Sequence, residues 1–168
     1  MNATFSSNFL PPHKSLVSVW DLDGTLADDS HRIHLLPSEG SSSPEEYEPY
    51  HQQHHLDPVI DKSKFVLDLL SLETEIIYLT SRPSNHRFST ARWIRSNGLP
   101  EGHLVMRPEG STMGSAEFKG IYLDYLILTC LCKVAFLFDD REDILQEGRS
   151  RGIKSIHPKQ IEQIIQDR

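Results

Sequence analysis

The chain alternates short apolar runs with longer segments of mixed polarity. Five runs are apolar or β-branched and have the length of buried strands: 16–20, 76–79, 103–106, 133–138 and 153–156. The segments between them carry apolar residues at helical spacing, which predicts helices over 61–72, 84–96, 115–127 and 141–151, with a last helix after residue 158. Strands that alternate with helices form parallel βαβ units, so the pattern predicts an α/β domain, with a parallel sheet of about five strands between two helical layers.

The predicted helices have marked ends, and one long segment interrupts the pattern. Ser84 and Ser115 are expected N-caps, and Gly152 closes the helix before it. The first two helices have these apolar positions: Phe65, Leu69, Leu70 and Leu72, then Phe88, Ala91 and Ile94. Residues 27–60 read as irregular and polar, with a loop signal at 40–44 and an acidic, histidine-rich stretch at 45–55. A length of 168 residues suggests a single domain over 1–168, in which 27–60 form a small cap-like insert.

Composition and hydropathy indicate a reducing, cytoplasmic setting. Cys130 and Cys132 lie one residue apart in an apolar run, which favours buried reduced thiols over a disulfide or a zinc site. The first 14 residues have neither the basic start nor the apolar stretch of a signal peptide. The most apolar segment, 125–138, contains Lys133 and is too short to span a bilayer, so no membrane association is expected.

The charge of the chain is acidic and uneven. The net charge is −7; residues 1–75 hold 4 Lys/Arg against 13 Asp/Glu, and residues 76–168 hold 13 against 11. The two balances, −9 and +2, exclude a general polyanion binder of the basic type. Any contact with nucleic acid is therefore expected to be local, at a few arginines.

Two acidic pairs follow predicted strands. Asp21 and Asp23 come directly after the first strand, where one carboxylate can attack phosphorus and the other can protonate the leaving oxygen, with Gly24 permitting the bend between them. An Asx-type turn is the simpler alternative for an isolated pair. Asp139 and Asp140 end the fourth strand, where paired acids favour a hard cation such as Mg²⁺; the alternative is a helix N-cap with acidic residues in its first turn.

Weaker signals come from single residues and from histidine and arginine groups. Thr80 ends the second strand and could bond a phosphate oxygen, and Lys119 lies in the first turn of a helix, where a nearby phosphate would explain a cation. Each has an ordinary alternative, as a strand-end threonine and as an exposed lysine. Five histidines suggest zinc, although loop histidines are usually solvated: His31, His34, His51, His54 and His55. Arg87, Arg92 and Arg95 share one predicted helix and suggest a basic strip, but a solvated face is the simpler interpretation.

Four groups of residues resemble, in their order and positions, the four motifs of the haloacid dehalogenase (HAD) superfamily: Asp21 to Thr25, Thr80, Lys119, and Asp139 with Asp140. A closer resemblance, over residues 16–157, is to the 3′-phosphatase domain of phage polynucleotide kinase and its stand-alone relatives. It rests on five segments: Leu26 to Ala27, His31 to Leu35, Thr80 to Pro83, Met106 to Gly110 and Phe138 to Arg141. The sequence departs from this pattern in two places. Residues 38–55 match it poorly, and residues 110–117 lack the acidic pair that usually precedes the lysine of the third motif.

The resemblance implies a Rossmann-like HAD fold and a magnesium-dependent phosphatase. Asp21 is the implied nucleophile, which becomes an aspartyl-phosphate, and Asp23 is the implied acid and base. Thr80 and Lys119 would hold phosphoryl oxygens. The remaining implied site residues are Arg82, Arg32, Ser81, Gly24 and Thr25 for substrate, and Asp21, the Asp23 carbonyl, Asp139 and Asp140 for Mg²⁺.

The implied substrate is a 3′-phosphate end of nucleic acid. The first and second motifs, at Asp21 and Thr80, lie 59 residues apart, and the second and third, at Thr80 and Lys119, lie 39 apart. These spacings leave only a minimal cap insertion and an open site. A nucleoside monophosphate is an alternative substrate that suits the acidic first half better, and a non-catalytic HAD-like binding module is an alternative of another class. No phosphate-binding loop of the Gly-x-x-x-x-Gly-Lys type occurs, so no attached kinase domain is expected.

Overall fold

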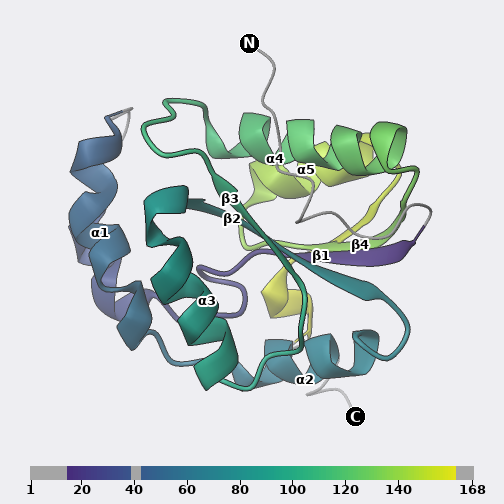
Figure 1. Cartoon of the computed structure of the whole chain (residues 1–168), viewed down its shortest axis with the longest axis horizontal. Coiled ribbons are helices and arrows are strands. Elements are labelled where there is room, and N and C mark those ends of the chain that lie inside the picture. Colours follow the sequence, from purple (N-terminus) through teal and green to yellow (C-terminus); the bar gives the residue numbers. More distant parts are fainter. Residues whose placement is uncertain (1–14, 39–42, 162–168) are drawn as a thin grey trace.

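A computed structural model describes residues 15–38 and 43–161, and in this part of the chain five strands form one sheet (Figure 1). The strands are β1 (Leu16–Trp20), β2 (Glu75–Pro83), β3 (His103–Arg107), β4 (Lys133–Phe138) and β5 (Lys154–Ile156). Their spatial order is β3-β2-β1-β4-β5, and every neighbouring pair is parallel. The predicted parallel α/β architecture is therefore confirmed.

Helices cover both faces of the sheet and complete three layers. α4 (Ser115–Asp124) and α5 (Glu142–Ser150) lie on one face, and α2 (Asp61–Leu70) and α3 (Arg87–Ser96) lie on the other (Figure 1). Successive side chains of a strand point to opposite faces, so Val17 and Val19 of β1 join one apolar core while Trp20 joins the other. Each fully buried aliphatic side chain in these cores contributes about 1.5–3 kcal/mol to stability.

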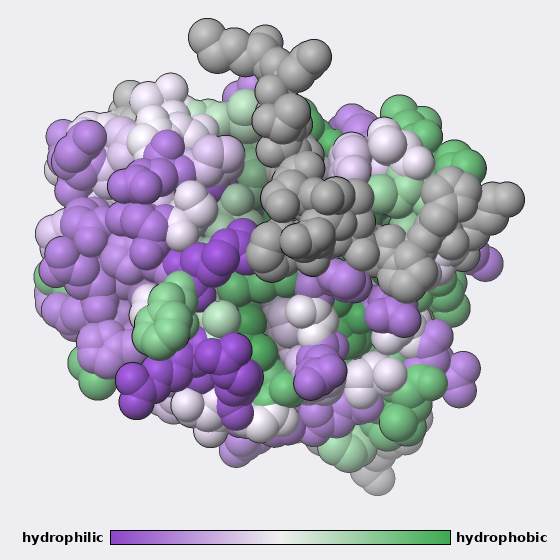
Figure 2. Space-filling view, viewed as in Figure 1, coloured by the Kyte–Doolittle hydropathy of each residue, from purple (hydrophilic) through white to green (hydrophobic). Residues whose placement is uncertain are grey.

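The insert at 27–60 is helical in short pieces, which corrects the prediction of irregular structure. It contains 3₁₀ turns at Ser30–Leu35, Pro44–Tyr47 and His54–Leu56, and α1 (Glu48–Gln52). Prolines at the starts of two of these pieces favour a first helical turn, but segments this short show no detectable periodicity in the sequence. The loop predicted at 40–44 lies mostly outside the described residues. The side of the molecule formed by the insert is covered by hydrophilic side chains (Figure 2).

The apolar positions that the sequence suggested for α2 and α3 are largely not the buried ones. Phe65 and Phe88 are 58% and 76% exposed, and Leu69 and Leu72 are also exposed. α2 buries Ser63 and Leu67, and α3 buries Thr90 and Trp93 together with the predicted Ile94. The predicted Leu70 and Ala91 are half-buried and pack against the same core. Each helix has more than one apolar stripe, and the contact with the sheet selects which stripe is covered.

Several predicted ends shift by a few residues. β2 extends through Pro83, and α4 continues into a π-helical turn, Tyr125–Thr129. Ser84 begins a 3₁₀ turn, and Gly114 rather than Ser115 precedes α4. Residues 158–161 are helical, and the rest of the predicted last helix lies outside the described residues.

Two predictions about apolar segments can be compared with the structure directly. Cys130 and Cys132 are both buried, and neither forms a disulfide within the described residues, as expected. Within the described residues, no helix has the length and apolar character needed to cross a membrane.

Candidate active site

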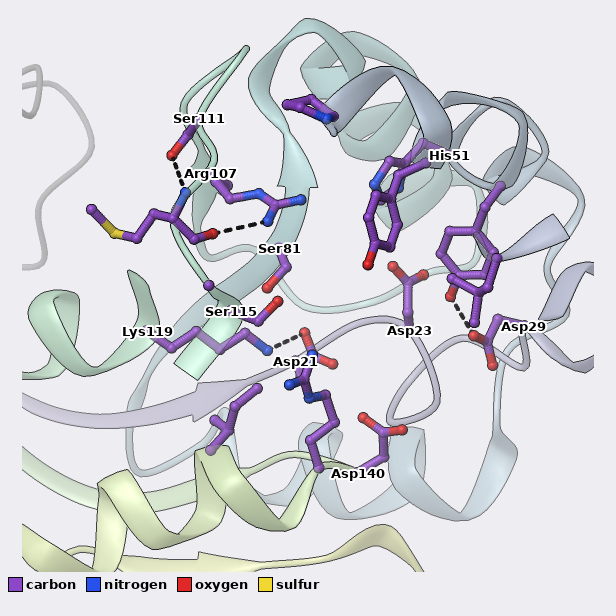
Figure 3. A pocket seen from close by; sticks show the side chains of 18 of the residues that line it. Asp21, Asp23, Asp29, His51, Ser81, Arg107, Ser111, Ser115, Lys119 and Asp140 are labelled. Atoms are coloured by element: carbon purple, nitrogen blue, oxygen red, sulfur yellow. Dashed lines mark hydrogen bonds and ion pairs between the residues drawn. The ribbon is translucent and has the colours of Figure 1, made fainter. Parts of the chain in front are cut away.

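The predicted site residues lie along the carboxyl edge of the sheet, where ligands of such sheets bind. Asp21 follows β1, Asp140 comes just after β4, and Ser81 lies near the end of β2. Together with Lys119 of α4, they line a cavity of about 400 Å³ (Figure 3). The fold thus brings together four segments that are far apart in the sequence.

Lys119 joins two of the carboxylates. Its Nζ lies 2.6 Å from Oδ1 of Asp21 and 2.7 Å from Oδ2 of Asp139, and all three side chains are buried. Burial alone would lower the pKa of Lys119, but Asp139 and Asp21 outweigh it and hold this pKa above its usual range. The ammonium therefore stays charged at neutral pH and offsets both carboxylates. Lys119 lies in the second turn of α4, one turn later than predicted.

Three carboxylates converge on one point where a cation could bind. Within the described residues, Asp21, Asp139 and Asp140 form the group whose ligand oxygens lie within 4.8 Å of one another. Burial raises the pKa of Asp140 to about 6, with Asp139 adding to the effect. Burial also raises the pKa of Asp21, although Lys119 acts against it. Oxygen ligands that are this costly to ionise fit a hard divalent cation such as Mg²⁺.

Asp139 and Asp140 are not side-chain caps of the following helix. Arg141 holds the N-cap position of α5, and Asp139 accepts a bond from the Arg141 backbone N–H at 3.0 Å. Asp140 instead lies beside Gly24, which has a φ of +73°. A Cβ at position 24 would lie 2.5 Å from Oδ2 of Asp140, so only glycine allows this turn and this carboxylate together.

Asp23 is held between two buried arginines. Arg82 donates to it from Nε at 3.0 Å and from Nη2 at 2.5 Å, and Nη2 of Arg32 lies 2.5 Å from its Oδ1. Burial would raise the pKa of Asp23, but Arg82 and then Arg32 outweigh it and hold this pKa well below its usual range. Asp23 is therefore ionised at neutral pH, and its side chain faces the arginines rather than the three converging carboxylates.

Asp57 binds both arginines, and no motif in the sequence identified it. Arg32 donates to Asp57 from Nε at 2.7 Å and from Nη2 at 2.6 Å, and Nη2 of Arg82 lies 3.2 Å from the same carboxylate. Both arginine side chains are fully buried. Arg32 and Arg82 thus support Asp23, and their predicted contact with substrate stays a prediction. Nη1 of Arg82 has no hydrogen-bond partner in the described part of the chain.

The strand places Ser81, rather than Thr80, on the wall of the cavity. Thr80 is fully buried, and its hydroxyl accepts a bond from the Arg82 backbone N–H at 3.2 Å. Ser81 lines the cavity, and its Oγ has no partner among the residues described. Thr25 is fully buried and is not part of the wall. Ser81 is consequently better placed than Thr80 to meet a ligand.

The insert and the segment after β3 complete the wall with residues that the sequence did not assign to the site. The insert contributes Asp29, Tyr47, Tyr50 and His51, and Arg107 comes from the end of β3. Tyr50 donates a hydrogen bond to Asp29 (Figure 3). Tyr47, Tyr50 and His51 lie in the stretch 38–55 where the sequence departs from the family pattern, so no motif could have identified them. Arg107 lies in the segment Met106 to Gly110 that carries the resemblance, but that segment implied no role for it.

Of the histidines expected to be solvated, His51 and His54 are buried. The Nδ1–H of His54 donates to the His51 carbonyl, and no histidine belongs to the three-ligand group found in the described residues. Arg92 and Arg95 are exposed on α3, while Arg87 donates to the Leu104 carbonyl at 3.0 Å. None of these three arginines lines the cavity.

Comparisons with solved structures show the HAD fold. No protein-family model matches the chain, and no curated protein matches it. Two chains from Pnkp1/Rnl/Hen1 complexes, one described as an RNA repair complex, have TM-scores of 0.66 and 0.62 at 19% and 22% identity. They cover 91% and 94% of this chain, but it spans only 46% and 50% of theirs. A haloacid dehalogenase-like hydrolase from Streptococcus pneumoniae has a TM-score of 0.57 at 16% identity, covering 84% of this chain and 83% of its own.

These likenesses confirm the predicted fold, including its three layers and parallel sheet. The chain spans about half the length of the two Pnkp1-complex chains, so what those whole proteins do is not transferred by the match. The site geometry must therefore carry the functional conclusion.

Proposed function

We propose that the protein is a HAD-type phosphomonoesterase that acts through an aspartyl-phosphate on Asp21. The observation that carries this proposal is the buried arrangement of Asp21, Lys119 and Asp139, with Asp140 beside them at the end of a parallel sheet. A binding module without chemistry gains nothing from burying two carboxylates against one lysine with a third, half-buried carboxylate beside them, since each buried charge costs stability.

The proposed reaction has two displacement steps. In the first, a carboxylate oxygen of Asp21 attacks phosphorus, the bond to the ester oxygen breaks, and Asp23 donates a proton to the departing alcohol. In the second, Asp23 accepts a proton from water as that water attacks the phosphoryl group, which releases inorganic phosphate and restores Asp21. Lys119 stabilises the charge that develops on the phosphoryl oxygens, and Ser81 can donate its free hydroxyl to one of them.

Asp21, Asp139, Asp140 and the Asp23 carbonyl are the proposed ligands of Mg²⁺. When bound, this ion supplies positive charge that polarises the phosphoryl group and keeps Asp21 ionised. The raised pKa of Asp21 and of Asp140 supports this assignment, because an added cation favours the charged form of both.

The acid role of Asp23 requires substrate to change its environment. The two arginines keep Asp23 ionised in the free protein, whereas a general acid must carry a proton. A phosphate dianion bound beside Asp23 competes for the positive charge of Arg82 and Arg32 and so raises the pKa of Asp23. The proton then reaches the leaving oxygen only when an ester is in place.

Asp23→Asn is expected to reduce turnover by roughly 10²–10⁴-fold, the usual scale of general acid–base catalysis. The loss should be smallest on aryl phosphates in the first step, because a good leaving group needs little protonation. The measurement is kcat/KM on an aryl phosphate and on a 3′-nucleotide, with Asp68→Asn on the exposed side of α2 as the control. An equal loss on both esters would contradict the acid role.

A 3′-phosphate end of nucleic acid is the proposed substrate. The small insert leaves the site open to a bulky ester, and the neighbouring fold from an RNA repair complex is consistent with this class. Arg107 lines the cavity, donates to the Met113 carbonyl at 3.2 Å, and pairs with no carboxylate among the described residues. Its remaining N–H groups can bond a backbone phosphate, because a guanidinium presents donors in a planar fork.

Arg107→Ala is expected to lower kcat/KM on a 3′-phosphorylated decamer by about 10-fold, the effect of losing one charge-assisted hydrogen bond, while aryl phosphate hydrolysis changes little. Raising salt should weaken decamer hydrolysis by the wild type selectively. Arg149→Ala, at an exposed pair on α5, is the matched control. A preference for 3′- or 5′-mononucleotides that salt does not change would replace this substrate with a nucleoside monophosphate.

A further inference from the structure

His51 in α1 is a buried histidine with unused hydrogen-bonding capacity. It is 4% exposed, it lines the cavity, and neither of its ring nitrogens has a hydrogen-bond partner in the described part of the chain. A buried polar group without a partner destabilises a protein, and most such groups are satisfied. An imidazole left this way on the wall of a cavity indicates that a ligand supplies the missing bonds.

The surroundings of His51 fix both its ring and its protonation state. The ring lies 5.4 Å from Tyr50 edge-on, 6.3 Å from Tyr47 in a stacked arrangement and 5.9 Å from His86. Burial lowers the pKa of His51 to about 3, although Asp23 acts in the opposite direction. At neutral pH the ring is uncharged and offers one N–H donor and one acceptor. Such a ring suits a hydroxyl group, which also donates and accepts, better than an anion.

His51 lies on the side of the cavity where the leaving group must be. Figure 3 places it near Asp23 and across from Asp21 and Lys119. Because Asp23 is the proposed donor to the ester oxygen, that oxygen lies within hydrogen-bond reach of Asp23. A hydroxyl on the neighbouring carbon of the alcohol can then reach toward the insert, where the ring nitrogens of His51 provide an unpaired donor and acceptor.

We propose, on the basis of the phosphatase function above, that His51 recognises the 2′-hydroxyl beside a 3′-phosphate and that the substrate is an RNA end. A ribose 3′-ester carries a hydroxyl on the adjacent carbon, whereas a deoxyribose 3′-ester and any nucleoside 5′-ester do not. The inference therefore separates ribonucleotide from deoxyribonucleotide ends, which the catalytic residues alone cannot do.

The experiment uses three 3′-phosphorylated decamers of one sequence: RNA, DNA, and RNA whose terminal nucleotide alone is 2′-deoxy. The wild type is expected to hydrolyse RNA about 10-fold more efficiently than the terminally deoxy decamer, as one lost hydrogen bond predicts. In His51→Phe this ratio should fall close to one, mainly through slower RNA hydrolysis. His55→Phe should keep the wild-type ratio, because His55 is exposed in the same insert and does not line the cavity.

The ratio of two substrates within one protein sample cancels any loss of folded enzyme. Aryl phosphate hydrolysis reports separately whether the site is intact. Wild-type enzyme that hydrolyses all three decamers equally would overturn the inference and leave the phosphatase function standing. An RNA preference that persists in His51→Phe would have the same consequence. Wild-type enzyme that releases phosphate from neither decamers nor aryl phosphate would instead remove the proposed function itself. If His51→Phe is inactive on every ester, the wild-type preference for RNA over the terminally 2′-deoxy decamer decides by itself whether the 2′-hydroxyl is recognised.

Discussion

Asp21→Asn is expected to lose essentially all phosphate release, roughly 10⁴-fold or more, because the covalent step has no other nucleophile. The carboxylate that attacks is the one whose Oδ1 lies 2.6 Å from Lys119, and an amide in that place keeps the shape but not the nucleophilic charge. Phosphate release on an aryl phosphate measures the loss. Acid-quenched wild-type enzyme should carry one phosphoryl group by mass, and Asp21→Asn should carry none.

Stability measurements separate lost chemistry from lost fold in this variant. Asp21 is buried and pairs with Lys119, so an uncharged amide removes a costly buried charge but also loses that ion pair. The two effects oppose each other, and the urea midpoint should change little. Asp68→Asn, at an exposed pair on α2, should leave both turnover and stability unchanged. Turnover that persists in a folded Asp21→Asn enzyme would require a different nucleophile.

Removal of divalent metal is expected to abolish turnover, and return of Mg²⁺ should restore it. The reason is that Asp21, Asp139 and Asp140 place three carboxylates within 4.8 Å, and Lys119 provides only one compensating charge. Mg²⁺ should also raise the melting temperature, since a ligand at 100 times its Kd adds about 2.7 kcal/mol to stability. Turnover and melting temperature are both measured over a series of chelator concentrations and again after Mg²⁺ is returned.

A matched variant ties this metal effect to the proposed ligands. Asp140→Asn should require a higher Mg²⁺ concentration for half-maximal activity and should show a smaller thermal shift. Asp143→Asn, at an exposed position of α5, should match the wild type. Full turnover in chelator would exclude the proposed metal-dependent mechanism. A thermal shift that is identical in wild type and Asp140→Asn would place the bound ion elsewhere.

The positions of the strongest motifs could be predicted because strand ends are local features. An apolar run that leads into Asp21 or Asp139 identifies both the strand and the carboxylate at its end, and parallel strands bring such ends to one edge. The helices were harder to orient. Phe65 and Phe88 follow helical spacing yet are exposed, because only the packed sheet determines which stripe of α2 or α3 is covered.

The α/β class, the five parallel strands and the acidic residues at their ends follow from the order of residues along the chain. That Arg32 and Arg82 bind Asp23, that Asp57 binds both arginines, and that His51 faces the cavity from the insert became visible only in the folded molecule. The difference lies in the range of the interactions. Strands and their ends follow from neighbouring residues, whereas an ion pair between Arg82 and Asp23 joins side chains 59 residues apart and depends on how the whole chain is packed.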